Sequence, residues 1–107
     1  MSVTRAELAA ALTTVPGLKG FPRAEAASAR AGDAYPRWAT DTRVAPGAFE
    51  RAWTIIVNLP DDVEKRESLT ESLRWPIVEA LAHLIHVDTY GPDVIDDRPV
   101  LMIIGRE

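Results

Sequence analysis

A change in hydrophobic period midway along the chain limits what this sequence can fold into. Within residues 50–59, large apolar side chains recur at every second position, which is the pattern of a β-strand with one buried face. These residues are Trp53, Ile55, Val57 and Leu59. After Pro60 the apolar residues recur at helical spacing instead, at Leu69, Leu73, Ile77, Leu81 and Leu84. A half-buried strand followed by an amphipathic helix predicts an α+β fold in which the helix packs on a sheet.

The first half of the chain is expected to contribute a second strand and an irregular region. Residues 37–44 alternate as a strand, and Ala45-Pro46-Gly47 turns the chain before the strand over residues 50–59. A short strand over residues 18–23 is possible. Residues 24–34 contain no large apolar anchor, so they are expected to form a helical turn or to stay irregular.

Two helices are expected, one short and one longer. Thr4 and Glu7 have the spacing of a capping box at the start of the first helix, and Ser68 and Glu71 repeat that spacing for the second. The apolar stripe of the first helix is Leu8, Leu12 and Val15. Pro76 lies within the second helix and is expected to kink it, because proline donates no backbone hydrogen bond there.

The C-terminal part of the sequence is expected to form a β-hairpin. Residues 87–94 form one arm, Asp96-Asp97-Arg98 turns the chain, and residues 100–104 form the other arm. Together these segments predict a mostly antiparallel sheet with both helices packed on it. The whole chain, 1–107, has the length of one domain.

The last strand is apolar on both faces, whereas a strand with one wet face alternates. We expect its inward set to be Val100, Met102 and Ile104. Leu101 and Ile103 would then lack cover, and Ile56 adds a further apolar side chain to the weaker face of its own strand. Because open apolar patches usually mark interfaces, neighbouring subunits are expected to cover this one. The predicted interface residues, including the loops around it, are Phe21, Arg23, Ile56, Asp96, Asp97, Arg98, Leu101 and Ile103.

Composition argues against several classes of function. The chain has no cysteine, which excludes disulfides and thiolate metal sites. Its formal net charge of −4 argues against a surface that neutralises nucleic-acid phosphates. No stretch reaches the roughly 18–20 apolar residues of a membrane span, and no signal core is evident, so we expect neither secretion nor a membrane anchor.

Residues that carry chemistry are sparse. His83, His86 and Asp88 have spacing that could hold a metal ion, but surface histidines at the end of the second helix explain the pair better. The sequence has neither a cysteine nucleophile nor a Gly-x-Ser-x-Gly elbow. We therefore expect no catalytic residue, no bound metal and no cofactor. The tryptophans, expected to fill the core, are Trp38, Trp53 and Trp75.

The order of elements resembles that of a known protein family. A short helix precedes an extended region with Phe21-Pro22 and Tyr35-Pro36, and a central strand ends in Asn58-Leu59-Pro60. A helix with an internal proline follows, over residues 71–78, and then a strand over residues 100–104. In this order the chain resembles the tail-terminator proteins of long-tailed bacteriophages, also called tail-completion or minor tail proteins.

The resemblance implies a structural virion protein rather than an enzyme. Members of this family form a hexameric ring that caps the tail tube, stops polymerisation of the major tail tube protein and presents the surface that the head-tail connector or stopper protein joins. DNA passes through without specific binding, which suits a negatively charged subunit. The expected location is the tail or neck of the virion, after assembly in the host bacterial cytoplasm.

Three other interpretations stay open at this point. The protein could be another neck component, such as a head-tail connector or stopper. It could be a small adaptor or antitoxin-like binding module unrelated to phages. It could be a metal-dependent hydrolase that uses His83, His86 and Asp88.

Overall fold

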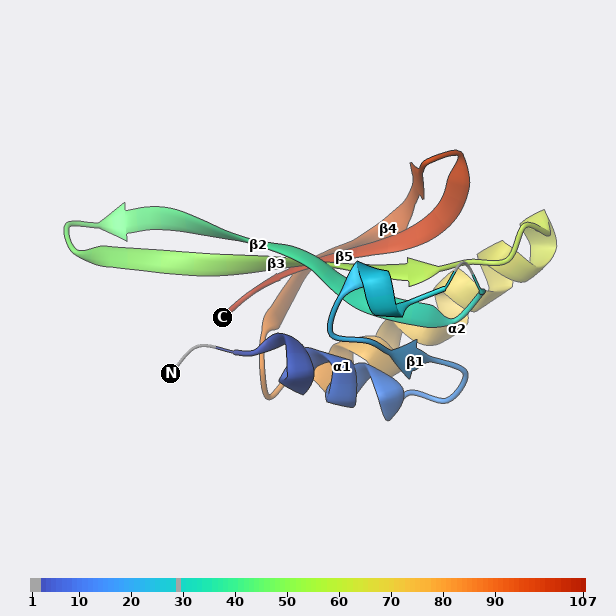
Figure 1. The fold of residues 1–107 in the computed structure, drawn as a ribbon, viewed down its shortest axis with the longest axis horizontal. Coiled ribbons are helices and arrows are strands. Elements are labelled where there is room, and N and C mark those ends of the chain that lie inside the picture. Colours follow the sequence, from blue (N-terminus) through green and yellow to red (C-terminus); the bar gives the residue numbers. More distant parts are fainter. Residues whose placement is uncertain (1–2, 29) are drawn as a thin grey trace.

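Strands in the order β1-β2-β3-β5-β4 form one sheet in the computed structural model, which describes residues 3–28 and 30–107 (Figure 1). The strands are β1 (Lys19–Gly20), β2 (Asp33–Ala45), β3 (Ala48–Asn58), β4 (His86–Ile95) and β5 (Arg98–Arg106). β1 pairs with β2 in parallel, and the other neighbours are antiparallel. The predicted α+β class with a mostly antiparallel sheet is therefore confirmed.

The first helix begins as the sequence indicates. α1 spans Arg5–Thr13, and its capping box is complete, because Thr4 Oγ1 accepts from the Glu7 amide while Glu7 Oε1 accepts from the Thr4 amide. Pro16 and Gly17 follow in the turn that leads to β1, and Gly17 adopts a φ of 90°. The short helical turn η1 (Ala24–Ala26) interrupts the irregular region before β2, and Ala29 in that region lies outside the described residues.

The second helix, α2 (Val63–Leu81), starts earlier than the capping-box spacing predicted. Asp62 is its N-cap, and Asp62 Oδ1 accepts from the Lys65 amide at 3.0 Å. Ser68 therefore lies inside the helix, and the prediction that it caps α2 was wrong. The acidic residues after Pro60 belong to this helix start, where the helix dipole favours carboxylates. The helix continues through Pro76.

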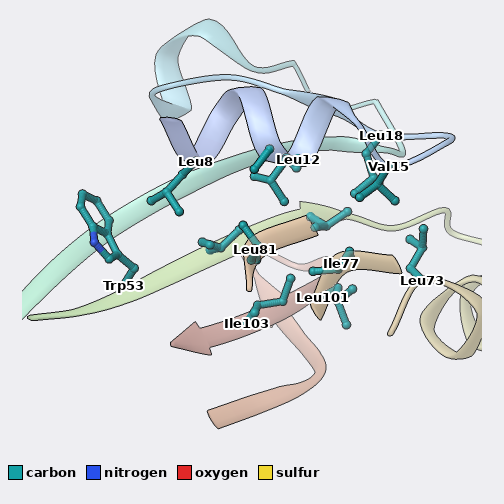
Figure 2. Packing of buried hydrophobic residues seen from close by; sticks show 14 of the residues in the cluster. Leu8, Leu12, Val15, Leu18, Trp53, Leu73, Ile77, Leu81, Leu101 and Ile103 are labelled. Atoms are coloured by element: carbon teal, nitrogen blue, oxygen red, sulfur yellow. The ribbon is translucent and has the colours of Figure 1, made fainter. Parts of the chain in front are cut away.

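Both α-helices pack on the same face of the sheet, and the core lies between them and the central strands (Figure 2). Leu8 and Leu12 of α1 and Ile77 and Leu81 of α2 are all fully buried. Strand residues of the core cluster are Trp53, Ile55, Val57, Leu101 and Ile103. Of the three tryptophans only Trp53 is buried; Trp38 and Trp75 are 44% and 66% exposed, so the prediction that all three fill the core was wrong.

The inward face of β5 is the opposite of the one predicted. Ile103 pairs with Ile55 and Leu101 pairs with Val57, and antiparallel partners share a face of the sheet. Leu101 and Ile103 are therefore fully buried against the helices, rather than open to a neighbouring subunit. A one-residue change of register exchanges the two faces of a strand, and a strand that is apolar at every position does not reveal which register it takes.

Candidate interaction surface

The sheet face that points away from the helices carries a partly exposed apolar group, here called the open face. It consists of Tyr35, Trp38, Met102 and Ile104. Tyr35 and Met102 are the two register partners of Ile56, and Trp38 and Ile104 are those of Thr54, which places all four on one face. The α-helices lie on the other face, so these side chains are partly accessible rather than part of the core cluster.

Two other apolar residues on the open-face side of the sheet are buried. Ile56 and Val100 are 0% and 3% exposed, although neither belongs to the core cluster between sheet and helices. Ile56 was predicted to contact a partner, but it is already fully buried within one subunit. A partner on the open face would therefore touch the side chains around Ile56 rather than Ile56 itself.

The second feature of this surface is an arm formed by residues 39–52 of the β2–β3 hairpin. β5 pairs with β3 only from Ala52 onward, and β1 pairs only with Asp33 and Ala34, so the arm extends past the rest of the sheet (Figure 1). Near its tip Phe49 is 66% exposed and Val44 is 59% exposed. Two-stranded hairpins that pack on nothing are marginally stable in water, so this arm is the part of the sheet with the least support from its own subunit.

Ion pairs stiffen the base of the arm. The Arg51 guanidinium donates to both carboxylate oxygens of Asp41, at 2.7 and 3.1 Å. Its hydrogen bonds to this carboxylate raise the pKa of Arg51 and lower that of Asp41. On the other face, Arg106 lies 2.9 Å from Asp88 and 3.6 Å from Glu50. The hairpin therefore leaves the sheet as a braced extension.

A bulge near the start of β2 aims Trp38 onto the open face. The register shifts between Pro36 and Trp38, and the extra residue, Arg37, stacks its guanidinium 4.3 Å from the Trp38 ring centroid. Arg5 of α1 donates to the carbonyl oxygens of Pro36, at 2.6 Å, and Arg37, at 3.3 Å. The helix therefore satisfies carbonyls that the bulge removes from the strand ladder.

One end of the open face is hollowed. A hollow of about 360 Å³ lies between residues 24–28 and the turn of the β4–β5 hairpin, and Tyr35 and Val100 are among the residues that line it. Ser28 holds one wall in place, because its hydroxyl donates to Asp33 Oδ2 at 2.7 Å. That hydrogen bond is the main cause of the lowered pKa of Asp33, a residue only 6% exposed. Asn58 Nδ2 donates to the Ser28 carbonyl oxygen at 2.8 Å.

The predicted loop residues lie on two sides of this region. Asp96 and Arg98 line the hollow, and Asp96 and Asp97 occupy the tight turn with φ values of 51° and 62°. All three turn residues are exposed. Arg23 is exposed at the N-cap of η1, while Phe21 is half-buried and its amide donates to the Ala34 carbonyl oxygen. The structure thus brings the hairpin turn close to the segment that follows Arg23.

The two histidines are placed differently from the sequence expectation. α2 ends at Leu81, so His83 lies in the following turn and His86 is the first residue of β4 rather than the end of the helix. His86 Nε2 is 3.7 Å from Asp88 Oδ1, and both histidines are exposed. Within residues 3–28 and 30–107, no three histidine, cysteine or acidic side chains are arranged to hold a metal ion.

Sequence reasoning missed the arm and most of the open face. Whether Phe49 and Val44 are exposed depends on where β5 stops pairing with β3, which no local pattern indicates. The alternation of β2 does indicate that Trp38, Thr40 and Thr42 share one face, because the bulge at Arg37 precedes all three residues.

No protein-family model, curated protein or solved structure matches this chain at a significant level. Neither α-helix of the described chain combines the length and apolar character needed to cross a membrane.

Proposed function

We propose that this protein is the subunit of a tail-terminator ring, which caps the tail tube of a long-tailed bacteriophage and joins it to the head connector. One observation carries the proposal: the two α-helices cover a single face of the sheet, and the opposite face presents a partly exposed apolar centre. Trp38 is 44% exposed there and Met102 and Ile104 are half-buried. Contiguous apolar surface of this kind commonly marks contact with other protein.

The order of the elements agrees with this role. A short first helix, a central strand that runs into Leu59 and Pro60, a helix that contains Pro76 and a closing strand follow one another as the resemblance implies. The hollow described above is bordered by Ser28, Asn58 and Arg98, and the described residues that line it include no histidine or cysteine. A structural role in an assembly fits these surfaces better than catalysis does.

The proposal is tested by the mass of the purified protein, alone and with a tail-tube subunit. We expect an oligomer of six chains by light scattering, and we expect its addition to stop growth of tail tubes in a polymerisation assay. Trp38→Asp should weaken the oligomer, because a charge in the open face must be desolvated there. Trp75→Asp is the matched control, since Trp75 is 66% exposed on α2, away from the open face.

Other outcomes would favour the alternative functions. A ring that forms but leaves tube growth unlimited would favour a connector or stopper. A one-to-one complex with an unrelated protein would favour an adaptor. Tightly bound zinc at one ion per chain, lost on replacement of His83 and His86, would favour a hydrolase.

A further inference from the structure

The geometry points to a specific contact between subunits: the arm of one copy lies across the open face of the next copy. Phe49 and Arg43 are the arm residues that make the contact, and the open face receives them around Met102. This inference rests on the proposed ring. It goes further by naming the two surfaces that meet and the direction in which one subunit contacts the next.

The side of the arm that faces the partner follows from the strand alternation. Phe49, Arg51 and Trp53 share one face of β3, and Trp53 belongs to the core beneath the helices. Along the arm the same face continues beyond the helices, so Phe49 is 66% exposed where Trp53 is 4% exposed. Its own subunit therefore leaves Phe49 uncovered, beside the charged side chains of Arg43 and of the Asp41–Arg51 pair.

Within one subunit the arm cannot reach the open face. The arm continues β3, the strand that lies between the β2 and β5 residues of the open face, and Phe49 points to the face opposite that of Met102 and its partner Ile56. Only a second copy can bring the two surfaces together. Such a contact joins two different patches head to tail, and repeated head-to-tail contacts generate a ring when the rotation between subunits closes.

The arm is long enough to span the receiving face. From its base to its tip it is about six residues per strand, or roughly 20 Å at the rise of a β-strand. From β2 to β4 the sheet crosses three strand spacings, which is roughly 14 Å. An arm laid across the open face would reach from one edge of the sheet to the other.

Charges agree with the same direction of contact. Arg43 is exposed near the arm tip, and none of the carboxylates in the described chain forms an ion pair with it. At the far edge of the open face, Asp93 is followed in the hairpin turn by Asp96 and Asp97, with Arg98 as the one cation in that group. A tip that carries a positive charge is therefore complementary to the acidic end of the surface that receives it.

Cysteine cross-linking tests this contact directly, because the natural chain has no cysteine. In the double variant Phe49→Cys/Met102→Cys, the two positions of one chain are separated by about seven residues along the sheet, or roughly 23 Å, and they lie on opposite faces. A disulfide needs Cα atoms within about 7 Å, so any disulfide must join two chains. We expect oxidation to give a ladder of linked subunits on a non-reducing gel, up to the size of the ring.

Matched variants make the result specific. Phe49→Cys/Trp75→Cys, with the second thiol on α2, should give no ladder, and each single variant should stay unlinked. Phe49→Asp should raise the dissociation constant of the assembly by at least about tenfold, as loss of an apolar anchor does. Its subunit should keep the unfolding midpoint of the natural protein, because Phe49 is exposed.

The outcomes separate this inference from the proposed function. A ring that gives no Phe49–Met102 cross-link, or one that assembles equally well with Phe49→Asp, overturns the arm contact and leaves the ring standing. Linkage of the single variant Phe49→Cys to itself would place arm against arm and also overturn the contact. A protein that stays monomeric at every concentration contradicts both proposals.

Discussion

The indole nitrogen of Trp53 donates a hydrogen bond of 3.0 Å to Glu107 Oε2, which ties the end of β5 to the root of the arm. The other carboxylate oxygen of Glu107 accepts from the Val3 amide at 2.9 Å, and Arg51 lies 4.0 Å from this carboxylate. The guanidinium of Arg5 stacks 5.6 Å from the centre of the Trp53 ring. One acidic side chain thus joins the segment before α1, the central strand and the arm.

Glu107→Ala should destabilise the subunit by about 1–3 kcal/mol, because Trp53 Nε1 and the Val3 amide lose a charged acceptor. Chemical denaturation followed by Trp fluorescence measures the free energy of unfolding. Glu79→Ala, at an exposed position of α2, is the matched control and should change it by less than about 0.5 kcal/mol. Equal effects of the two substitutions would show that Glu107 contributes no more than a surface carboxylate does.

Leu81→Ala should cost about 2–5 kcal/mol, since it removes a fully buried side chain from the contact between α2 and the sheet. The melting temperature should fall by many degrees in a domain of this size. Val94→Ala, at a position 64% exposed on β4, should leave the melting temperature nearly unchanged. A Leu81→Ala variant with the same melting temperature as the natural protein would contradict the packing seen in Figure 2.

The elements of this fold were predictable where hydrophobic period and turn chemistry agree. β3 alternates strictly through Trp53, Ile55 and Val57, and α2 repeats Leu73, Ile77 and Leu81 at helical spacing, so both elements and their buried faces follow from the pattern. The face of β5 was not predictable, because its central residues are apolar at every position. Long-range pairing with β3 makes that choice, and no residue within β5 encodes it.

The same limit explains which surface residues were predicted. The turn at Asp96 and Asp97 is exposed because of its local chemistry, which the sequence displays. The exposure of Phe49 depends instead on β3 extending beyond β5, and the burial of Ile103 depends on the register between β5 and β3. An interface built from strand ends therefore needs the three-dimensional structure.

Asp97→Gly should stabilise the subunit by about 0.5–1 kcal/mol. Both turn residues have positive φ, 51° at Asp96 and 62° at Asp97, and glycine occupies that region without steric cost. Part of the gain is offset because glycine also gives the unfolded chain more freedom. Thermal denaturation of Asp97→Gly measures the change in stability. Asp93→Gly is the control, because it lies on a strand, where glycine weakens pairing. A lower melting temperature for Asp97→Gly would show that the carboxylate itself holds the turn.

Stability should fall in alkali because of Tyr90. The Tyr90 hydroxyl donates to the Thr70 carbonyl oxygen of α2 at 2.6 Å, and burial raises the pKa of Tyr90 from 10.0 to about 12. Since the folded state holds this proton more tightly than the unfolded state, the contribution is complete below pH 10 and is lost as the pH rises toward about 12. Urea denaturation at several pH values measures the loss.

Tyr90→Phe isolates that contribution. At neutral pH the variant should be less stable by about 1 kcal/mol, because the Thr70 carbonyl oxygen loses its donor. The difference between the natural protein and the variant should shrink between pH 10 and about 12, as the natural protein loses the stability of the protonated hydroxyl while phenylalanine does not titrate. Tyr35→Phe, on the open face, controls for general alkaline effects. If the difference in unfolding free energy between the natural protein and Tyr90→Phe stays constant across this pH range, the hydroxyl of Tyr90 titrates alike in the folded and unfolded states.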